Sequence, residues 1–126
     1  MSNQATHIDL SVAAEPRLAR LVRMTAANVA TLSNMSVERV EDIRMAAEEA
    51  FIYACGTEPG ATLDIAFDAD DAHVAMAFVL GDIAFAEPSE DDPTSAYVDL
   101  ILGSVCDSYE KREGPATLLL DVKADV

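Results

Sequence analysis

One pair of side chains in this sequence, Glu49 and Tyr53, has types and a spacing that could support chemistry. The two residues are four positions apart in the segment 37–55, and on a helix this spacing places them on one face. Magnesium prefers hard oxygen ligands, but a phenol is a poor one at neutral pH because its reference pKa is about 10. Glu49 is therefore interpreted as a leftover or structural carboxylate that bonds Tyr53 or an arginine, with a catalytic role as the alternative.

The cysteines and histidines form no recognisable site in the sequence. Cys55 and Cys106 are far apart, with no CxxC pair and no histidine at a ligand spacing, so neither a metal site nor a redox motif is indicated. We predict two buried thiols, because free cysteine is among the residues most often buried. His73 lies beside a predicted turn and is expected to point to solvent.

Charge and composition restrict the partners of this chain. Its 126 residues are 51% hydrophobic and carry a formal charge of −15, which predicts one compact domain with a real core. An acidic surface repels nucleic acid and anionic lipid, and it suits a basic protein partner. No apolar run approaches the length of a membrane span, and the segment 1–10 lacks the features of a signal peptide. We expect a cytoplasmic protein.

The segment 37–55 has the pattern of the helix that must position Glu49 and Tyr53. Ser36 is predicted to cap its N-terminus, and Gly56 with Pro59 to end it. Apolar residues recur at steps of three and four, as on one side of a helix. The side predicted to be buried consists of Val37, Val40, Ile43, Ala47, Ala50, Phe51 and Ala54.

The other segments predict a small α/β fold around this helix. Segments 61–68 and 72–80 alternate apolar and polar residues on either side of a short turn, which predicts a hairpin. Segment 81–95 has prolines and many acidic residues and is predicted to be an exposed loop. Further helices are expected at 15–33 and 94–110, and further strands at 7–12 and 115–123. The expected architecture is a two-layer sandwich, with three helices on one face of a mixed four-stranded sheet.

The segment 40–54, together with the order of the elements, resembles the anti-sigma factor serine kinases. These belong to the histidine-kinase-like ATPase superfamily, which has the Bergerat fold. The positions that match the helix motif of the family are Asp42, Ile43, Arg44, Ala46, Ala47, Glu49, Ala50 and Ala54. The resemblance implies that residues 1–126 form a single domain of this superfamily with a Bergerat-like sheet.

The resemblance also assigns roles to individual positions. Glu49 stands where family members have the glutamate that activates the attacking serine hydroxyl or a water. Tyr53 stands where they have the asparagine that holds magnesium. Gly81 and Asp82 fall within the motif that binds the adenine base. These four residues are the candidate nucleotide-site positions.

Three departures from the family pattern predict that nucleotide chemistry is lost. Tyr53 removes the metal ligand and partly fills its space. The position of the adenine-binding aspartate is apolar, at Phe78 or Val79. The segment 95–100, which should present backbone amides to the phosphates, contains no glycine. Acidic residues at 87–92, in the place of the nucleotide lid, would also repel a triphosphate. We therefore expect no cofactor and a vestigial Glu49.

Three functional hypotheses follow. The first is an anti-sigma regulatory factor-like protein that binds a sigma factor or an anti-anti-sigma factor without phosphoryl transfer; family members often form homodimers. The second is an active kinase that uses ATP and magnesium to phosphorylate an anti-anti-sigma factor, with Glu49, Asp82 and Asp99 as candidate ligands. The third is a small α/β subunit of unrelated role.

Overall fold

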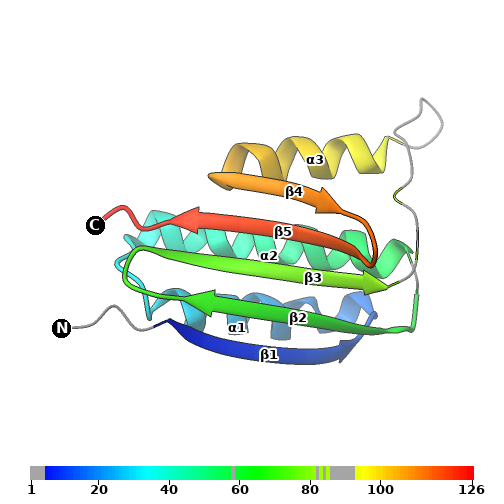
Figure 1. Ribbon diagram of the computed structural model, residues 1–126, viewed down its shortest axis with the longest axis horizontal. Helices are drawn as coiled ribbons and strands as arrows, with labels where there is room; N and C mark the ends of the chain where they lie inside the picture. The colour runs from blue at the N-terminus through cyan, green and yellow to red at the C-terminus, as the bar shows by residue number, and fades with distance from the viewer. Residues whose placement is uncertain (1–4, 58, 82, 84, 86–92) are drawn as a thin grey trace.

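The computed structural model of the protein describes residues 5–57, 59–81, 83, 85 and 93–126. In these residues a five-stranded antiparallel sheet is combined with three α-helices (Figure 1), which confirms the predicted α/β class. The elements follow one another as β1 (Thr6–Ala13), a short 3-10 helix η1 (Pro16–Leu18), α1 (Ala19–Ala30), α2 (Val37–Thr57), β2 (Thr62–Ala69), β3 (His73–Gly81), α3 (Thr94–Val105), β4 (Ser108–Arg112) and β5 (Ala116–Lys123).

The strands lie in the order β1-β2-β3-β5-β4, and every neighbouring pair is antiparallel. In Figure 1, α1 and α2 lie behind the sheet, and α3 lies beside the edge strand β4. The predicted hairpin is confirmed, since β2 and β3 pair from Asp64 with Val79 to Ala69 with Val74. None of the helices in the described part of the chain is both long and apolar enough to cross a membrane.

The prediction of a mixed sheet with four strands is wrong. Every strand pair is antiparallel, and a fifth strand, β4, begins inside the segment predicted as the end of helix 94–110. The chain leaves α3 at Cys106, where the backbone becomes extended (φ −90°, ψ 148°). Asp107 then accepts hydrogen bonds from the Arg39 side chain and from the backbone amide of Lys123. These contacts with residues distant in sequence outweigh the helical periodicity of the segment and direct it along β5.

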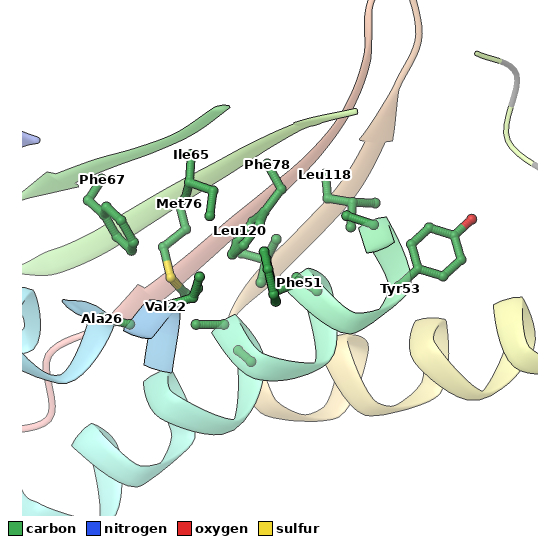
Figure 2. Close-up of a cluster of buried hydrophobic side chains, with 14 of the residues drawn as sticks. Val22, Ala26, Phe51, Tyr53, Ile65, Phe67, Met76, Phe78, Leu118 and Leu120 are labelled. Carbon is green, nitrogen blue, oxygen red and sulfur yellow. The ribbon is translucent and has the colours of Figure 1, made fainter. Parts of the chain in front are cut away.

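The core lies between the sheet and the helices α1 and α2 (Figure 2). Inward and outward residues alternate along β2 and β3, as predicted. On α2, small alanines let the helix approach the sheet, and Figure 2 shows Phe51 directed toward Phe78 and Leu118. Val37, predicted to be buried, is 79% exposed, whereas burial is confirmed for Ile43, Ala47, Ala50, Phe51 and Ala54.

The N-terminus of α2 is anchored to the end of the chain. The Ser36 hydroxyl accepts a hydrogen bond from the Arg39 amide at 3.2 Å, which confirms the predicted cap. The same hydroxyl donates to the Asp125 carboxylate, and this bond lowers the pKa of Asp125. Arg39 also donates to the Lys123 carbonyl at 2.7 Å. These bonds fix the position of α2 against β5, and so they set the direction in which Glu49 and Tyr53 point.

Candidate functional site

Glu49 and Tyr53 lie on α2 as predicted, but in different surroundings. Glu49 is half-buried, and it has no hydrogen bond or ion pair with any residue that the structure describes. Tyr53 is only 8% exposed, and Figure 2 shows its ring to one side of the central core cluster. The hydrogen bond or ion pair predicted for Glu49, with Tyr53 or with an arginine, is therefore absent among the described residues.

Tyr53 belongs to a group of side chains that surround the ammonium of Lys111. The Lys111 Nζ atom lies 5.7 Å from the centre of the Tyr53 ring and 5.5 Å from that of Phe85, within the range of cation–π attraction. The same atom is 2.9 Å from Asp99 Oδ1 and donates to Ser95 Oγ at 3.2 Å. We call these residues, together with Tyr109, the Lys111 cluster; its members are Tyr53, Phe85, Ser95, Asp99, Tyr109 and Lys111.

Tyr109 completes the cluster from the strand that the sequence did not predict. Its hydroxyl donates to Asp99 Oδ1 at 2.7 Å. Burial, and then the hydrogen bond with Asp99, raise the pKa of Tyr109 well above its usual range. The phenol therefore stays protonated and serves as a fixed donor. Asp99 thus accepts from both Lys111 and Tyr109, and α3 is fastened to β4.

The cluster is suited to holding elements together, and it leaves little for chemistry. A lysine ammonium has three donor hydrogens, and Lys111 directs them toward the two oxygens of Asp99 and the hydroxyl of Ser95. Two aromatic rings cover the same ammonium. The cation is thus enclosed between α2, α3 and β4, and its side chain is 22% exposed.

Gly81 and Asp82 complete the set of predicted positions. Gly81 ends β3 with φ +100°, which a residue with a Cβ rarely adopts. A register shift between Val79 and Gly81 brings Gly81 opposite Ala116 of β5. Asp82 and the acidic segment 87–92 lie outside the described residues. Of the three candidate positions that the structure describes, Tyr53 alone belongs to the Lys111 cluster.

The structure also describes the surroundings of the two cysteines and of His73. Both cysteines are free and buried, as predicted, and burial raises the pKa of Cys106 to about 12. His73 lies next to the predicted turn with 38% of its side chain exposed, but its ring is held by two carboxylates, with Nδ1 2.5 Å from Asp121 and Nε2 3.3 Å from Asp70. Across the described ranges, no group of three or more acidic, histidine or cysteine residues is arranged to hold a metal ion.

Sequence reasoning missed the roles of Lys111 and Tyr109. Tyr109 falls within the predicted helix 94–110 and Lys111 directly after it, whereas both lie on β4 facing the core side, paired with Leu120 and Leu118 of β5. The alternation of Tyr109 and Lys111 with polar neighbours in Ser108–Arg112 was the available signal. That stretch is only five residues long, too short to outweigh the helical pattern before it.

In the comparisons with known proteins, the sequence matches no protein-family model and no curated protein. The resemblance to the anti-sigma factor kinases therefore rests on the segment 40–54 and on the order of the elements.

Proposed function

We propose that this chain is an anti-sigma regulatory factor-like protein that acts by binding a protein partner, its nucleotide chemistry having been lost. Residues 1–126 form one Bergerat-type, two-layer domain in this proposal, and the protein works in the cytoplasm. The partner is a sigma factor or an anti-anti-sigma factor. The order of helices and strands and the motif on α2 support the family assignment.

The observation that carries the proposal is the Lys111 cluster. It connects Tyr53, at the family position of the magnesium ligand, with Ser95 and Asp99, in the segment that corresponds to the phosphate-binding turn. Asp99 was one of the three carboxylates available to an active kinase as a ligand. It is already bonded to Lys111 and Tyr109. If the family positions carry over, a built-in cation takes the place of the metal ion and the open backbone that nucleotide binding needs, which supports the loss of nucleotide chemistry.

The loss of nucleotide binding is tested by measuring the melting temperature of the protein at increasing concentrations of ATP and magnesium. A ligand present at one hundred times its dissociation constant stabilises a fold by about 2.7 kcal/mol, so binding would be plain in a thermal shift. We expect no shift for the wild-type protein up to millimolar nucleotide. Stabilisation at sub-millimolar nucleotide would contradict the proposal and favour an active serine kinase.

Variants separate the contributions of the ligand position and of the built-in cation. Tyr53→Asn restores the amide that family members use, and Lys111→Met removes the ammonium while keeping a similar apolar volume. We expect neither single variant to bind nucleotide, because the adenine position stays apolar. Arg20→Met, at an exposed position on α1, serves as the control for loss of a cation. Nucleotide binding by Tyr53→Asn alone would show that the other motifs are less damaged than proposed.

Binding to a purified sigma factor or anti-anti-sigma factor, measured by calorimetry, tests the partner class directly. Association at micromolar concentration or tighter is the expected result. If neither protein binds, the proposed partner class is wrong, and a small α/β subunit of unrelated role becomes the better description.

A further inference from the structure

The face of the sheet opposite to α1 and α2 has an apolar centre. In the middle of the central strand β3, the side chains on this face are Ala75, Ala77 and Val79, which are all half-buried. The register places Ala66 of β2 and Leu119 of β5 on either side of Ala77. Figure 1 shows no helix in front of the sheet on this side. A sheet face that stays in water is normally lined by polar residues, so this centre differs from an ordinary solvated face.

The small size of these side chains leaves room above the strands. Alanine is depleted in strands because it packs poorly on a pleated surface, yet three alanines lie side by side here on β2 and β3. One hollow of about 500 Å³ is lined by residues of β3, β5 and β4, among them Ala77, Leu119 and Glu110. A second, of about 400 Å³, is lined by residues of β1, β2 and β3. Another backbone element could approach this face closely.

Carboxylates flank the apolar centre on both sides. Residues paired across neighbouring strands form rows that run perpendicular to the strands. In these rows Ala75 lies between Asp68 and Asp121, and Val79 lies next to Asp64. The row through Ala77 ends at Asp9 on β1 and at Glu110 on β4. The permanent cations on the same face are Arg112 and Lys123, and its histidines are His7 and His73. His7 bonds Asp68 and Asp9, and His73 bonds Asp121; these bonds raise the pKa of both histidines. The five carboxylates still outnumber the two permanent cations and the two histidines together, so the face is acidic.

The dimensions of this face match those of a helix. The stretch from Ala75 to Val79 is roughly 13 Å long at the rise of a strand, which is about nine residues of helix. The outer columns, on β2 and β5, are two strand spacings or about 10 Å apart, and a helix is about 10–12 Å wide. A helix lying along β3 would thus meet apolar side chains beneath it and carboxylates on both flanks.

We propose that this open face docks a basic amphipathic helix of a protein partner, with its apolar side on Ala75, Ala77 and Leu119 and its cationic side chains beside Asp64, Asp68 and Asp121. Charge complementarity selects this occupant. A second copy of the chain would bring two acidic faces together, and nucleic acid or anionic lipid would meet like charge. The inference rests on the proposed binding function and names the surface that performs it.

A synthetic peptide of defined chemistry tests this docking. The probe is a labelled helix of about 18 residues, long enough to form some helix alone, with alanine and leucine on one side and lysines flanking them. One control peptide has the same composition in a non-amphipathic order, and another has glutamate in place of lysine. We expect only the amphipathic lysine peptide to bind. Its affinity should fall as added salt screens the charges. Its binding should shift the backbone amide NMR signals of β2, β3 and β5.

Variants of the face show whether binding takes place there. Ala77→Glu places a bulky charge at the apolar centre and should weaken binding at least about tenfold, the effect of losing a central contact. Asp64→Asn with Asp68→Asn, which keeps the shape of the side chains, should weaken binding and reduce its salt dependence. Glu38→Gln with Glu41→Gln removes the same charge from the exposed side of α2 and should have no effect.

Several results would overturn the inference. These are NMR shifts confined to the helices, equal binding of the acidic peptide, unchanged affinity in Ala77→Glu, or a dimer of the chain that Ala77→Glu abolishes. If a sigma factor or anti-anti-sigma factor binds Ala77→Glu as well as the wild type, the docking face is wrong while the proposed function stands. If the peptide docks on the face but neither of those proteins binds, the partner class is wrong while the face stands.

Discussion

Single residues in this protein hold elements together that the sequence keeps far apart. Lys111 is the clearest case, because its ammonium contacts Tyr53 of α2 and Asp99 of α3 from a position on β4. A tyrosine at position 53 is a poor metal ligand, but it supplies an aromatic face for a cation. Tyr53, which the family resemblance interprets as the loss of a metal ligand, thus has a structural use of its own.

His73 should make stability depend on pH. The hydrogen bond from its ring to Asp121 is the main cause of a raised pKa, so the folded state binds the proton more tightly than the unfolded chain, whose reference value is 6.5. This stability is fully present below pH 6.5 and is lost as the pH rises through the higher folded value. The side chain is 38% exposed, which limits the effect to about 0.5–1 kcal/mol.

Urea unfolding of the wild type and of His73→Gln, measured between about pH 5.5 and 8.5, checks this expectation. The wild type should be the more stable of the two at the acid end of the range, and the difference should shrink at the alkaline end. His7, which also bridges two carboxylates, is present in both proteins and so cancels in the comparison. A difference that does not change with pH would contradict the assignment.

At the scale of elements, the edge strand β4 depends on contacts made by α2. Arg39, whose side chain is only 17% exposed, donates to Asp107 just before β4 and to the Lys123 carbonyl at the end of β5. It also bonds Asp42 on its own helix at 3.2 Å. Arg39 therefore fastens the helix that carries Tyr53 to the two strands beside the Lys111 cluster.

Replacing Arg39 with methionine should loosen this edge of the sheet. The variant keeps the apolar part of the side chain but leaves Asp107 without its guanidinium partner, which should cost about 2–3 kcal/mol of unfolding free energy. Amide hydrogen exchange in β4 should speed up more than in β2. The matched control, Arg20→Met, changes an exposed arginine of α1 and should cost less than about 0.5 kcal/mol. Equal stability of the two variants would disprove the role of Arg39.

The sequence predicted the elements more reliably where the pattern was long. The period of α2 identified Ile43 and Phe51 as buried, and the alternation along Leu63 to Phe67 and Val74 to Leu80 identified the hairpin. It failed at β4, where a five-residue edge strand follows directly after a helix. Two of the six members of the Lys111 cluster were missed with that strand, because Tyr109 and Lys111 could not be placed beside Tyr53.

At the scale of the whole molecule, charge is the dominant property. A formal charge of −15 on 126 residues means that the folded chain repels itself, and the described ion pairs offset only part of that repulsion. Compact folding concentrates this charge, so stability should depend on screening. The same surplus makes a cationic partner the natural one for the open face of the sheet.

Added salt should therefore stabilise the protein. Raising sodium chloride from about 10 mM to 150 mM shortens the Debye length from about 30 Å to 8 Å and should raise the melting temperature by about 2–5 °C. Choline chloride at equal ionic strength should have the same effect if screening is the cause. A melting temperature that falls with either salt would mean that the ion pairs contribute more than the repulsion costs.

The sequence by itself determined the α/β class, the hairpin of β2 and β3, the buried face of α2 and the acidic character of the surface, because local periodicity and composition carry these properties. Only the tertiary structure decided the fifth strand, the antiparallel order and the two groupings on which function is argued. Residues 53, 95, 99, 109 and 111 meet around one ammonium, and residues 66, 75, 77, 79 and 119 meet on one open face. Both groupings depend on strand register and on contacts between distant segments, which no local pattern encodes.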